Sequence, residues 1–599
     1  MGFLARIQRE VRFVGALNRL LDGVKGISPD SRELICDDFE KAVDRFPENV
    51  AVLCDGRQLT YRELDSLSNR YAHWAKGRGL RRGDTVALLM PNRLEYVAIW
   101  MGLAKVGVST ALVNNNLTGQ GLAHCLAATG VAHVLADGET WQAIEDVRDR
   151  IGRSVMLWVL GLSSEDETSE RRGLDTSVKG ASNVRPDRSA RDGLKAADTA
   201  LYIFTSGTTG LPKAAKITHQ RAQLYMRAFA AATKAKPDDR IYCALPLYHS
   251  TGGLCAVGAA LLTGASLVIR KRFSAAAFWP EVVDTGSTLF VYIGELCRYL
   301  VNQPEHELEQ QHRIRLAFGN GLRPEVWPTF QKRFAIPEIL EFYGSTEGNV
   351  SLFNFDGKPG AIGRIPKYLR NRFNIRLVKF DLEEGEPVRG SDGLCVEARP
   401  GEVGEAIGEI AADARHDFSG YADKAASEKK ILRDVFKRGD AFFRTGDLMR
   451  QDDQGYLYFV DRIGDTFRWK GENVSTTEVA ERVAGAPGVR EVAVYGVAVP
   501  GAEGKAGMAA IVADESFDLE AFRDHIDHEL PPYARPQFLR LQRDMETTGT
   551  LKYTKTGLVA DGFNPVGSKD KVFYRHPEKG YVRVDKRVLA KLEAGEMKF

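Results

Sequence analysis

The feature that most constrains the fold of this chain is an apolar segment that leads directly into a loop of glycines and hydroxyl residues. Residues Ala200 to Phe204 are continuously hydrophobic, as in a buried strand. The next nine residues, Thr205 to Lys213, have the sequence TSGTTGLPK. Glycines let backbone N–H groups approach an anion, hydroxyls donate to its oxygens, and a lysine adds positive charge. The segment therefore predicts a strand that ends in a polyphosphate-binding loop.

This loop differs from the most common nucleotide-binding loop, because the pattern G-x-x-x-x-G-K-[ST] is absent. An ordinary surface turn can have the same composition. The loop alone therefore does not identify a nucleotide, and the rest of the chain must decide.

Helix and strand patterns alternate on both sides of the loop. Between Leu34 and Leu160, strand patterns such as Val86 to Met90 are followed by helical patterns such as Tyr96 to Val106. This alternation is typical of layered α/β domains with parallel strands. The stretch from Ser163 to Asp198 is rich in Ser, Asp, Arg and Gly, and we expect an exposed, poorly ordered connection there.

After about Gly404 strand patterns dominate, with a hairpin turn at Asp452 to Gly455. From about Ile463 an α+β pattern follows, and Ser475 to Glu478 is a capping box. A chain of 599 residues is too long to fold around a single hydrophobic core. We therefore predict an α/β protein with several domains. The large N-terminal domain has layered α/β subdomains plus a β-rich subdomain, and a small C-terminal α+β domain follows. The predicted boundaries are 1–25 for an N-terminal helix, 26–462 for the large domain and 463–599 for the small one.

Charge and cysteine content exclude several classes of protein. Lys and Arg number 82 against 80 Asp and Glu, so the overall charge gives no reason to expect a nucleic-acid partner. The seven cysteines include no C-x-x-C pair, which disfavours a disulfide framework and a zinc site. No run has the length of a membrane-spanning helix. These features favour a cytoplasmic protein.

The first 25 residues have the pattern of a basic amphipathic helix. Such a helix can lie on the anionic inner face of a membrane, or it can dock on its own domain. The sequence leaves both possibilities open. The apolar positions are Phe3, Leu4, Ile7, Val11, Val14, Leu17 and Leu21, and the basic ones are Arg6, Arg9, Arg12 and Arg19.

Three further polar segments stand at the ends of predicted strands. Tyr343 to Gly348 offers an aromatic ring, hydroxyls and a carboxylate within one turn. Gly319 to Gly321 would let a flat base lie against the backbone, and Thr445 to Asp447 would bring a carboxylate to ribose hydroxyls. Each is an ordinary turn when taken alone. Together they predict a nucleotide site, because open α/β sheets bind ligands beyond the carboxyl ends of their strands.

With these motifs in this order, the chain resembles the adenylate-forming acyl-CoA synthetases over nearly its whole length. Thr205–Lys213 is similar to their phosphate loop, Tyr343–Gly348 to their adenine and magnesium motif, and Thr445–Asp447 to their ribose motif. Asp461-Arg462 resembles the start of their hinge, and Thr548–Lys552 resembles the motif with their adenylation lysine.

The segments Asp461–Val479, Val113–Leu117 and Gly294–Leu300 narrow the resemblance to the fatty-acid transport protein, or very-long-chain acyl-CoA synthetase, branch. Two departures matter. Gly464 stands where the general family often has Asp or Lys, which suits a backbone pivot. Leu551-Lys552 replaces the usual Gly-Lys, so the assignment of the adenylation lysine depends on the spacing to Lys555 and Leu558. Of the two lysines, Lys552 is favoured over Lys555.

The resemblance implies ATP, Mg²⁺ and coenzyme A as cofactors and assigns residues to them. The implied catalytic residues are Lys213, Thr346, Glu347 and Lys552, of which Glu347 also holds the metal. The implied nucleotide contacts are Thr205, Ser206, Gly207, Thr208, Thr209, Gly210, Lys213, Gly319, Asn320, Gly321, Tyr343, Gly344, Thr346, Asp447 and Arg462. The implied substrate or CoA contacts are His249, Trp469, Lys470 and Gly471. Simpler alternatives stay open: a surface ion pair for Asp447 and Arg462, core packing for Tyr343 and His249, an ordinary basic turn for Trp469–Glu472, and solvated charges for Glu347 and Lys552.

The activity implied is ATP-dependent joining of a long-chain or very-long-chain fatty acid to coenzyme A through an acyl-adenylate. Rotation of the small domain would exchange Lys552 for Trp469–Glu472 between the two steps. One alternative is a ligase for another bulky carboxylate, such as a steroid or bile acid. Another is a membrane-associated fatty-acid uptake protein. Peripheral membrane contact through residues 1–25 and a homodimer are further expectations.

Overall fold

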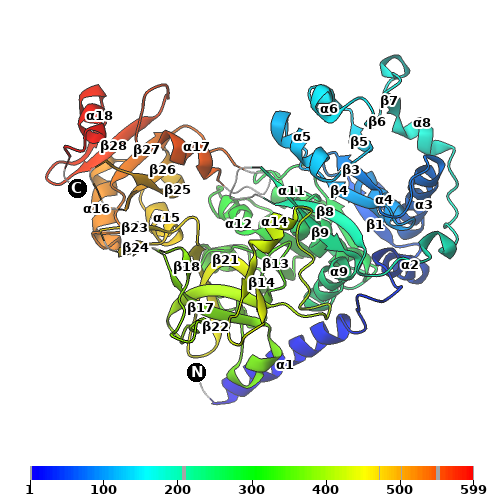
Figure 1. The fold of residues 1–599 in the computed structure, drawn as a ribbon, viewed down its shortest axis with the longest axis horizontal. Coiled ribbons are helices and arrows are strands. Elements are labelled where there is room, and N and C mark those ends of the chain that lie inside the picture. The colour runs from blue at the N-terminus through cyan, green and yellow to red at the C-terminus, as the bar shows by residue number, and fades with distance from the viewer. Residues whose placement is uncertain are drawn as a thin grey trace. The chain divides into compact units, whose positions relative to one another are not determined.

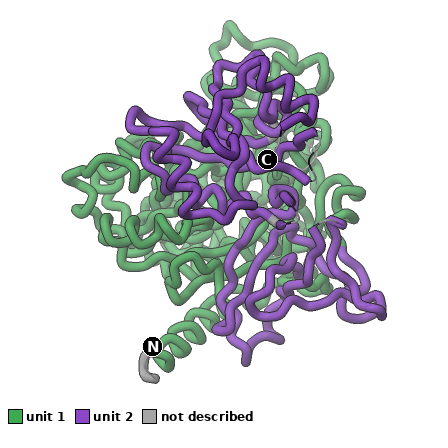
Figure 2. The backbone as a smooth tube through the Cα atoms, turned by 90° about the vertical axis from the view of Figure 1, so that its left-hand side faces the viewer, with its two compact units in different colours: residues 1–364, 409–431 green, residues 365–408, 432–599 purple. Residues whose placement is uncertain are grey.

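The computed structural model describes residues 3–205, 211–382, 384–470, 472–500, 502, 504–547 and 553–597. The chain divides into two compact units (Figure 2). The first unit comprises Met1–Arg364 and Glu409–Ile431, and the second comprises Ile365–Gly408 and Leu432–Phe599. The second unit thus includes both the β-rich segment and the C-terminal α+β segment. The predicted boundary between residues 462 and 463 falls inside this unit and stays a prediction.

One sheet of the first unit has the strand order β7-β6-β5-β3-β4-β8-β9. Its neighbouring strands are parallel apart from the antiparallel pair β8/β9, which confirms the predicted layered α/β fold. The bounds are β3 Thr85–Leu89, β4 Ser109–Leu112, β5 His133–Asp137, β6 Met156–Leu160, β7 Arg171–Gly173, β8 Thr199–Thr205 and β9 Lys213–Thr218.

A second sheet of the same unit has the order β15-β14-β13-β12-β10-β11-β1-β2. It is parallel from β14 to β1 and antiparallel at both edges. The bounds are β1 Val50–Cys54, β2 Arg57–Thr60, β10 Arg240–Cys243, β11 Ser266–Ile269, β12 Leu289–Ile293, β13 Leu316–Asn320, β14 Glu338–Gly344 and β15 Ser351–Asn354.

Local sequence signals explain where the helices of this unit begin and how closely they pack (Figure 1). Helix α3 (Tyr61–Gly77) begins at a capping box in which Thr60 accepts from the Glu63 backbone and the Glu63 side chain returns to Thr60. A Cβ on Gly102 of α4 would lie 2.2 Å from the Ser68 carbonyl oxygen, so α3 and α4 approach closely only because this residue is glycine. Other helices are α2 Ile35–Arg45, α4 Glu95–Ala104, α5 Gly119–Ala128, α8 Leu174–Lys179, α9 His219–Thr233, α11 Phe278–Asp284, α12 Gly294–Val301 and α13 Val326–Arg333.

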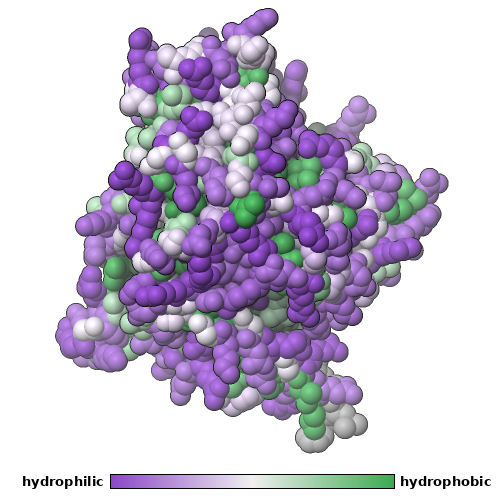
Figure 3. Space-filling view, turned by 90° about the vertical axis from the view of Figure 1, so that its right-hand side faces the viewer, coloured by the Kyte–Doolittle hydropathy of each residue, from purple (hydrophilic) through white to green (hydrophobic). Residues whose placement is uncertain are grey.

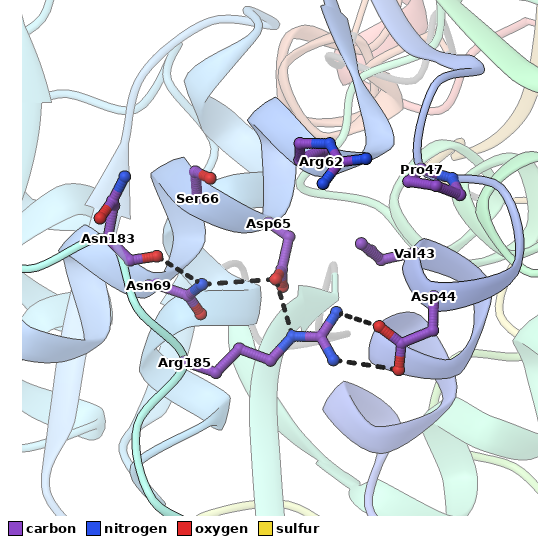
Figure 4. Close-up of a pocket in the computed structure, with 9 residues that line it drawn as sticks. All are labelled: Val43, Asp44, Pro47, Arg62, Asp65, Ser66, Asn69, Asn183 and Arg185. Carbon is purple, nitrogen blue, oxygen red and sulfur yellow. Dashed lines mark hydrogen bonds and ion pairs between the residues drawn. The ribbon is translucent and has the colours of Figure 1, made fainter.

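The expectation of a poorly ordered connection over residues 163–198 is wrong. The stretch contains β7 and α8, and its arginines make ion pairs with acids of the helices. Arg185 lies 2.8 Å from Asp65 and 2.8 Å from Asp44, beside a polar pocket of about 340 Å³ (Figure 4). A count of polar residues does not show that these arginines have buried carboxylate partners.

Helix α1 (Phe3–Gly23) docks along one side on its own unit. Phe13 is buried, with its ring 6.2 Å from Phe355 and the Arg364 guanidinium 4.3 Å from its centroid. On another face of the helix, Ile7 and Val11 are 44% and 67% exposed. Figure 3 shows hydrophobic side chains at this end of the molecule, at the bottom of the view. No helix within the described ranges combines the length and hydrophobicity needed to cross a bilayer.

The second unit has a β-rich part and an α+β part. In the β-rich part, β21 and β22 form the predicted hairpin through the turn at Asp452–Gly455. In the α+β part, a sheet of order β25-β26-β27-β28-β29 packs around a core that includes Trp469, Ile511 and Phe538. The bounds are β17 Ile375–Asp381, β18 Glu386–Pro387, β19 Val403–Glu409, β21 Ala441–Gln451, β22 Tyr456–Arg462, β23 Phe467–Trp469, β24 Glu472–Val474, α15 Thr476–Ala484, β25 Val489–Ala498, β26 Lys505–Ala513, α16 Leu519–Glu529, β27 Phe538–Gln542, α17 Lys555–Asp561, β28 Lys571–His576, β29 Gly580–Arg583 and α18 Lys586–Glu593.

Candidate functional site

The two ends of the predicted phosphate loop are held together by strand pairing. Thr205 is the last residue of β8 and Lys213 is the first residue of β9, and the two are directly opposite in the antiparallel register. The two described ends of the predicted loop are therefore neighbours at the carboxyl end of β8, the strand that the sequence predicts before the loop. Its remaining candidate residues, Ser206, Gly207, Thr208, Thr209 and Gly210, lie outside the described residues.

Tyr421 joins three of the predicted residues and was not found from the sequence. Its hydroxyl donates to Glu347 Oε1 at 2.6 Å, and Lys213 Nζ lies 5.7 Å from its ring centroid. The side chain of Thr205 also interacts with this hydroxyl. No sequence motif includes Tyr421. It lies in a segment that pairs with β9 through the bridge Ala215↔Tyr421. Only the fold brings it to the loop.

The Tyr343–Gly348 turn is held by its backbone carbonyl groups. Arg221 of α9 donates from Nε to the Thr346 carbonyl oxygen at 2.9 Å and from Nη2 to those of Ser345 and Gly348. Tyr225 of the same helix donates to the Ser345 carbonyl oxygen at 2.7 Å. Neither residue was predicted from the sequence, because each lies more than 100 positions from the turn; Arg221 and Thr346 are 125 positions apart.

The hydroxyl of Thr346 has a neighbour from the segment that contains His249. Ser250 Oγ and Thr346 Oγ1 lie 3.1 Å apart. His249 itself is half-buried, with its ring 4.6 Å from Tyr248, and Gly253 donates to its carbonyl oxygen at 2.7 Å. This places the predicted acyl or pantetheine gate beside the predicted phosphate contact, and the gating role stays a prediction.

The Gly319–Gly321 segment packs too tightly for side chains at its first position. A Cβ on Gly319 would lie 2.1 Å from the Tyr292 carbonyl oxygen, and Gly321 has a φ of +79°. Asn320 Oδ1 is buried and makes no hydrogen bond among the described residues. A buried acceptor without a donor is costly, and a ligand amino group would satisfy it. This supports the predicted contact with a base.

Behind this segment lies a buried carboxyl group. Glu341 of β14 accepts from the Tyr292 hydroxyl at 2.5 Å and from the Leu322 backbone N–H at 3.1 Å. Burial raises its pKa to about 8. The group therefore helps to fix the turn that follows Asn320, and no sequence pattern pointed to it.

In the second unit, Asp447 and Arg462 are register partners across β21 and β22. Arg462 Nε lies 3.4 Å from Asp447 Oδ1, so the pair is an ion pair in this structure. The Thr445 hydroxyl accepts from the Asp447 backbone N–H at 3.0 Å and donates to the Ala406 carbonyl oxygen at 2.6 Å. Thr445 thus orients the strand end, and the ribose contact stays a prediction.

Trp469 and Lys470 have contrasting positions at the tip of the β23/β24 hairpin. Trp469 is 1% exposed and belongs to the core of the second unit, whereas Lys470 is exposed and has a φ of +51°. Lys470 is therefore accessible, as is Glu472 of the same predicted CoA-facing segment. Gly471 lies outside the described residues, and the CoA contacts stay predictions.

The predicted adenylation lysine, Lys552, also lies outside the described residues. Lys555, the alternative, contacts the predicted hinge segment instead. Its Nζ lies 3.4 Å from Asp465 Oδ2 and 3.2 Å from Thr476 Oγ1. Lys555 thus contacts Asp465 and Thr476 in this structure. Lys552 stays the favoured candidate for the adenylation lysine.

The chain matches two family models and many individual relatives over most of its length. The family described as AMP-binding enzyme matches residues 39–422, and the AMP-binding enzyme C-terminal domain matches residues 478–552. Long-chain fatty acid transport protein 1 of Mus musculus is 42% identical over 564 residues, which cover 93% of this chain and 87% of that protein. Long-chain fatty acid transport protein 3 of Homo sapiens is 43% identical over 498 residues, covering 82% and 72%.

Solved structures with similar folds include an anthranilate CoA ligase in complex with anthranoyl-AMP. It has a TM-score of 0.74 at 20% identity and covers 88% of this chain and 97% of its own. ATP-bound MatB from Rhodopseudomonas palustris has a TM-score of 0.72 at 22% identity, with coverage of 88% and 98%. These similarities confirm the adenylate-forming fold that the sequence motifs predict.

Proposed function

This chain belongs to the AMP-binding enzyme family, and from that membership we propose that it joins long-chain or very-long-chain fatty acids to coenzyme A. It is an AMP-forming ligase, and the reaction runs through an acyl-adenylate. In the first step the fatty carboxylate attacks the α-phosphorus of ATP and pyrophosphate leaves. In the second step the CoA thiol attacks the acyl carbonyl and AMP leaves.

The observation that carries this proposal is the convergence of Thr205, Lys213 and Glu347 on Tyr421. A cation, a hydroxyl and a carboxylate gathered around one side chain suit a triphosphate and its counter-ion. Carboxylate and triphosphate repel each other, so the first barrier falls mainly through positive charge and oriented donors. Lys213 steadies the β- and γ-phosphates, which become the leaving pyrophosphate.

The turn at Tyr343–Gly348 supplies the contacts to the rest of the nucleotide. The Thr346 hydroxyl donates to the α-phosphate, and Tyr343 stacks on the adenine. Arg221 fixes three carbonyl groups of this turn, so these side chains need little reorganisation during the reaction. The amide oxygen of Asn320 accepts from the adenine amino group.

Glu347 fits the role of a magnesium ligand. Mg²⁺ prefers hard oxygen donors and is usually held by one or two carboxylates together with phosphate oxygens and water. Only Oε1 of Glu347 accepts from Tyr421, so the other oxygen can bind a cation. When bound with ATP, Mg²⁺ neutralises charge on the phosphates.

Residues of the second unit complete the proposal. Asp447 accepts from the ribose hydroxyls once Arg462 turns toward the phosphate. Lys552 bridges the carboxylate and the α-phosphate in the first step. The small domain then turns about Arg462–Asp465, which withdraws Lys552 and brings Lys470 toward CoA, while His249 gates the pantetheine path.

Helix α1 is proposed to bring the enzyme to the inner face of a membrane, where its substrate resides. Its exposed residues Ile7 and Val11 neighbour the exposed cations Arg6 and Arg12, a combination that suits an anionic lipid surface. Replacing the exposed Ile7 and Val11 by serine is expected to reduce sedimentation with anionic vesicles and to leave activity on soluble substrate unchanged, because the buried Phe13 is kept. Unchanged sedimentation would exclude this role.

An uptake function is the second candidate, because the relatives are named long-chain fatty acid transport proteins. Pyrophosphate release that requires fatty acid, and acyl-CoA formation that requires both fatty acid and CoA, would establish the ligase activity. A panel of fatty acids of increasing length, with a bile acid included, then identifies the acid. A bile acid used better than every fatty acid would replace the proposed substrate class, and the absence of pyrophosphate release with all acids would refute the ligase.

A further inference from the structure

Tyr421 is a buried side chain that contacts three residues of the proposed Mg·ATP site and has no role in the function described so far. It is 4% exposed. Its hydroxyl contacts Glu347 and Thr205, and its ring faces the Lys213 ammonium. A residue that touches the carboxylate, the cation and the start of the phosphate loop is placed to set the geometry of all three.

The backbone on both sides of Tyr421 is fixed to β9. Lys216 N–H donates to the Gly420 carbonyl oxygen at 3.0 Å, and Ala422 N–H donates to the Ala214 carbonyl oxygen at 2.8 Å. The Tyr421 N–H itself donates to Ser427 Oγ at 2.9 Å. Because the main chain is held in this way, the position of the Tyr421 ring depends on the strand that Lys213 begins.

The hydroxyl and the ring make chemically different contacts. The Tyr421 hydroxyl is the donor in this pair, because a carboxylate oxygen can only accept. A hydrogen bond to an ionised carboxylate is stronger than one between neutral groups, and here it occupies Oε1 of Glu347. The face of the ring attracts an ammonium within about 6 Å of its centroid, which is where Lys213 lies.

We infer that Tyr421 is a positioning residue for Mg·ATP: its hydroxyl aims Glu347 at the metal, and its ring holds Lys213 toward the phosphates. The inference rests on the proposed function, because it assumes that Glu347 and Lys213 bind Mg²⁺ and ATP. Two substitutions separate the role of the hydroxyl from the role of the ring. Tyr421→Phe removes the hydroxyl and keeps the ring, whereas Tyr421→Leu removes both.

The test is equilibrium binding of ATP to the full chain, measured by calorimetry over a range of Mg²⁺ concentrations. Tyr421→Phe is expected to raise the Mg²⁺ concentration for half-maximal ATP binding by about tenfold, the effect of losing one hydrogen bond to a charged group. Its affinity for ATP in excess chelator should equal that of the wild type. Tyr421→Leu should also weaken metal-free ATP binding by a few-fold, because Lys213 loses its ring contact.

Tyr242→Phe is the matched control, since the Tyr242 hydroxyl donates to Glu281 at the same distance of 2.6 Å. This variant loses an equally short hydroxyl–carboxylate bond in a pair formed by β10 and α11. An unchanged Mg²⁺ dependence in Tyr421→Phe, or an equal shift in Tyr242→Phe, would overturn the inference while the wild type still binds Mg·ATP. A wild type that binds no ATP at any Mg²⁺ concentration would refute the proposed function as well.

Discussion

Two segments with candidate site residues are held in opposite ways. The first is Ser345–Gly348 in the first unit, where Arg221 is 6% exposed and donates to backbone carbonyl groups. Main-chain oxygens held by a buried guanidinium cannot turn without breaking several hydrogen bonds at once. The side chains of Thr346 and Glu347 therefore project from a fixed frame.

The second segment is Asp461–Asp465 in the second unit, which is anchored at its ends. Buried Asp461 accepts from the Thr476 backbone N–H at 2.6 Å, and Asp465 pairs with Lys555 at 3.4 Å. Between them, a Cβ on Gly464 would meet nothing within 4 Å. Open space and a glycine between two anchors are what a pivot requires.

The two segments are therefore suited to different functions. A phosphate-binding turn gains from being fixed before the nucleotide arrives, because reorganisation adds to the barrier. A segment that must exchange one set of residues for another gains from weak, reversible contacts. Substitutions in the two segments should therefore have distinct effects on stability and on the two half-reactions.

The largest expected effect is that of Lys552→Ala. Loss of the bridging cation should lower acyl-adenylate formation by about 10²–10³-fold, measured as pyrophosphate exchange. CoA transfer from a pre-formed acyl-adenylate should keep its rate, because that step takes place with the lysine withdrawn. Lys555→Ala is the matched control and should retain adenylation to within a few-fold. Equal loss of both half-reactions in Lys552→Ala would contradict the assignment of Lys552 to the first step alone.

Arg221→Met should have the next largest effect. It leaves the carbonyl groups of Thr346 and Gly348 without their side-chain donor, at a cost of about 1–3 kcal/mol for each unsatisfied group, whereas Ser345 keeps its hydrogen bond from Tyr225. Adenylation should fall by about 100-fold, the effect of losing one oriented contact in the transition state, and the melting temperature should fall with it. Arg227→Met on the same helix breaks the ion pair with Asp38. It should lower stability without a comparable loss of adenylation at a temperature where it is folded.

The sequence predicted the alternation of strands and helices and the segments with candidate site residues, because these depend on local chemistry. Thr205, Lys213 and Glu347 stand in motifs with glycines and hydroxyls at fixed spacing. Tyr421, Arg221 and Glu341 do not, since each acts on a segment distant in the chain. What they contact is set by sheet register and helix packing, which local patterns do not encode.

The same limit explains the error over residues 163–198 and the ambiguity of α1. Composition describes a residue's own preference for water, whereas Arg185 is ordered by Asp44 and Asp65 from other helices. Helical periodicity shows that a helix has an apolar face and does not show what covers it. Packing of Phe13 answers that question for one side of α1 alone.

The buried Glu341, which fixes the turn after Asn320, is tested by the pH dependence of Glu341→Gln. The ordinary pKa of 4.5 is raised to about 8 in the folded protein. As pH rises from about 4.5, the unfolded chain loses this proton while the folded chain keeps it. Stability therefore falls by up to about 1.4 kcal/mol per pH unit until about pH 8, where the slope ends.

Glu341→Gln should remove that contribution, so its unfolding free energy should depend less on pH between 5 and 8 than that of the wild type. Denaturant titrations at several pH values measure this difference. The variant should be somewhat less stable near pH 5, because an amide nitrogen cannot accept from Tyr292 or Leu322 as a carboxyl oxygen does. Parallel curves for the two proteins would show that Glu341 is ionised in the folded state.

The smallest effect is expected for Lys555→Met, which removes the ion pair with Asp465 in the pivot segment. The partly exposed pair contributes about 0–1 kcal/mol, so global stability should hardly change. If the pair favours one orientation of the small domain, its loss shifts the ratio of the two half-reaction rates by a few-fold. Asp465→Asn should shift the ratio in the same direction, whereas Arg490→Met, which breaks the exposed pair with Asp514, should leave it unchanged. Opposite shifts in Lys555→Met and Asp465→Asn would mean that the pair does not act on the pivot.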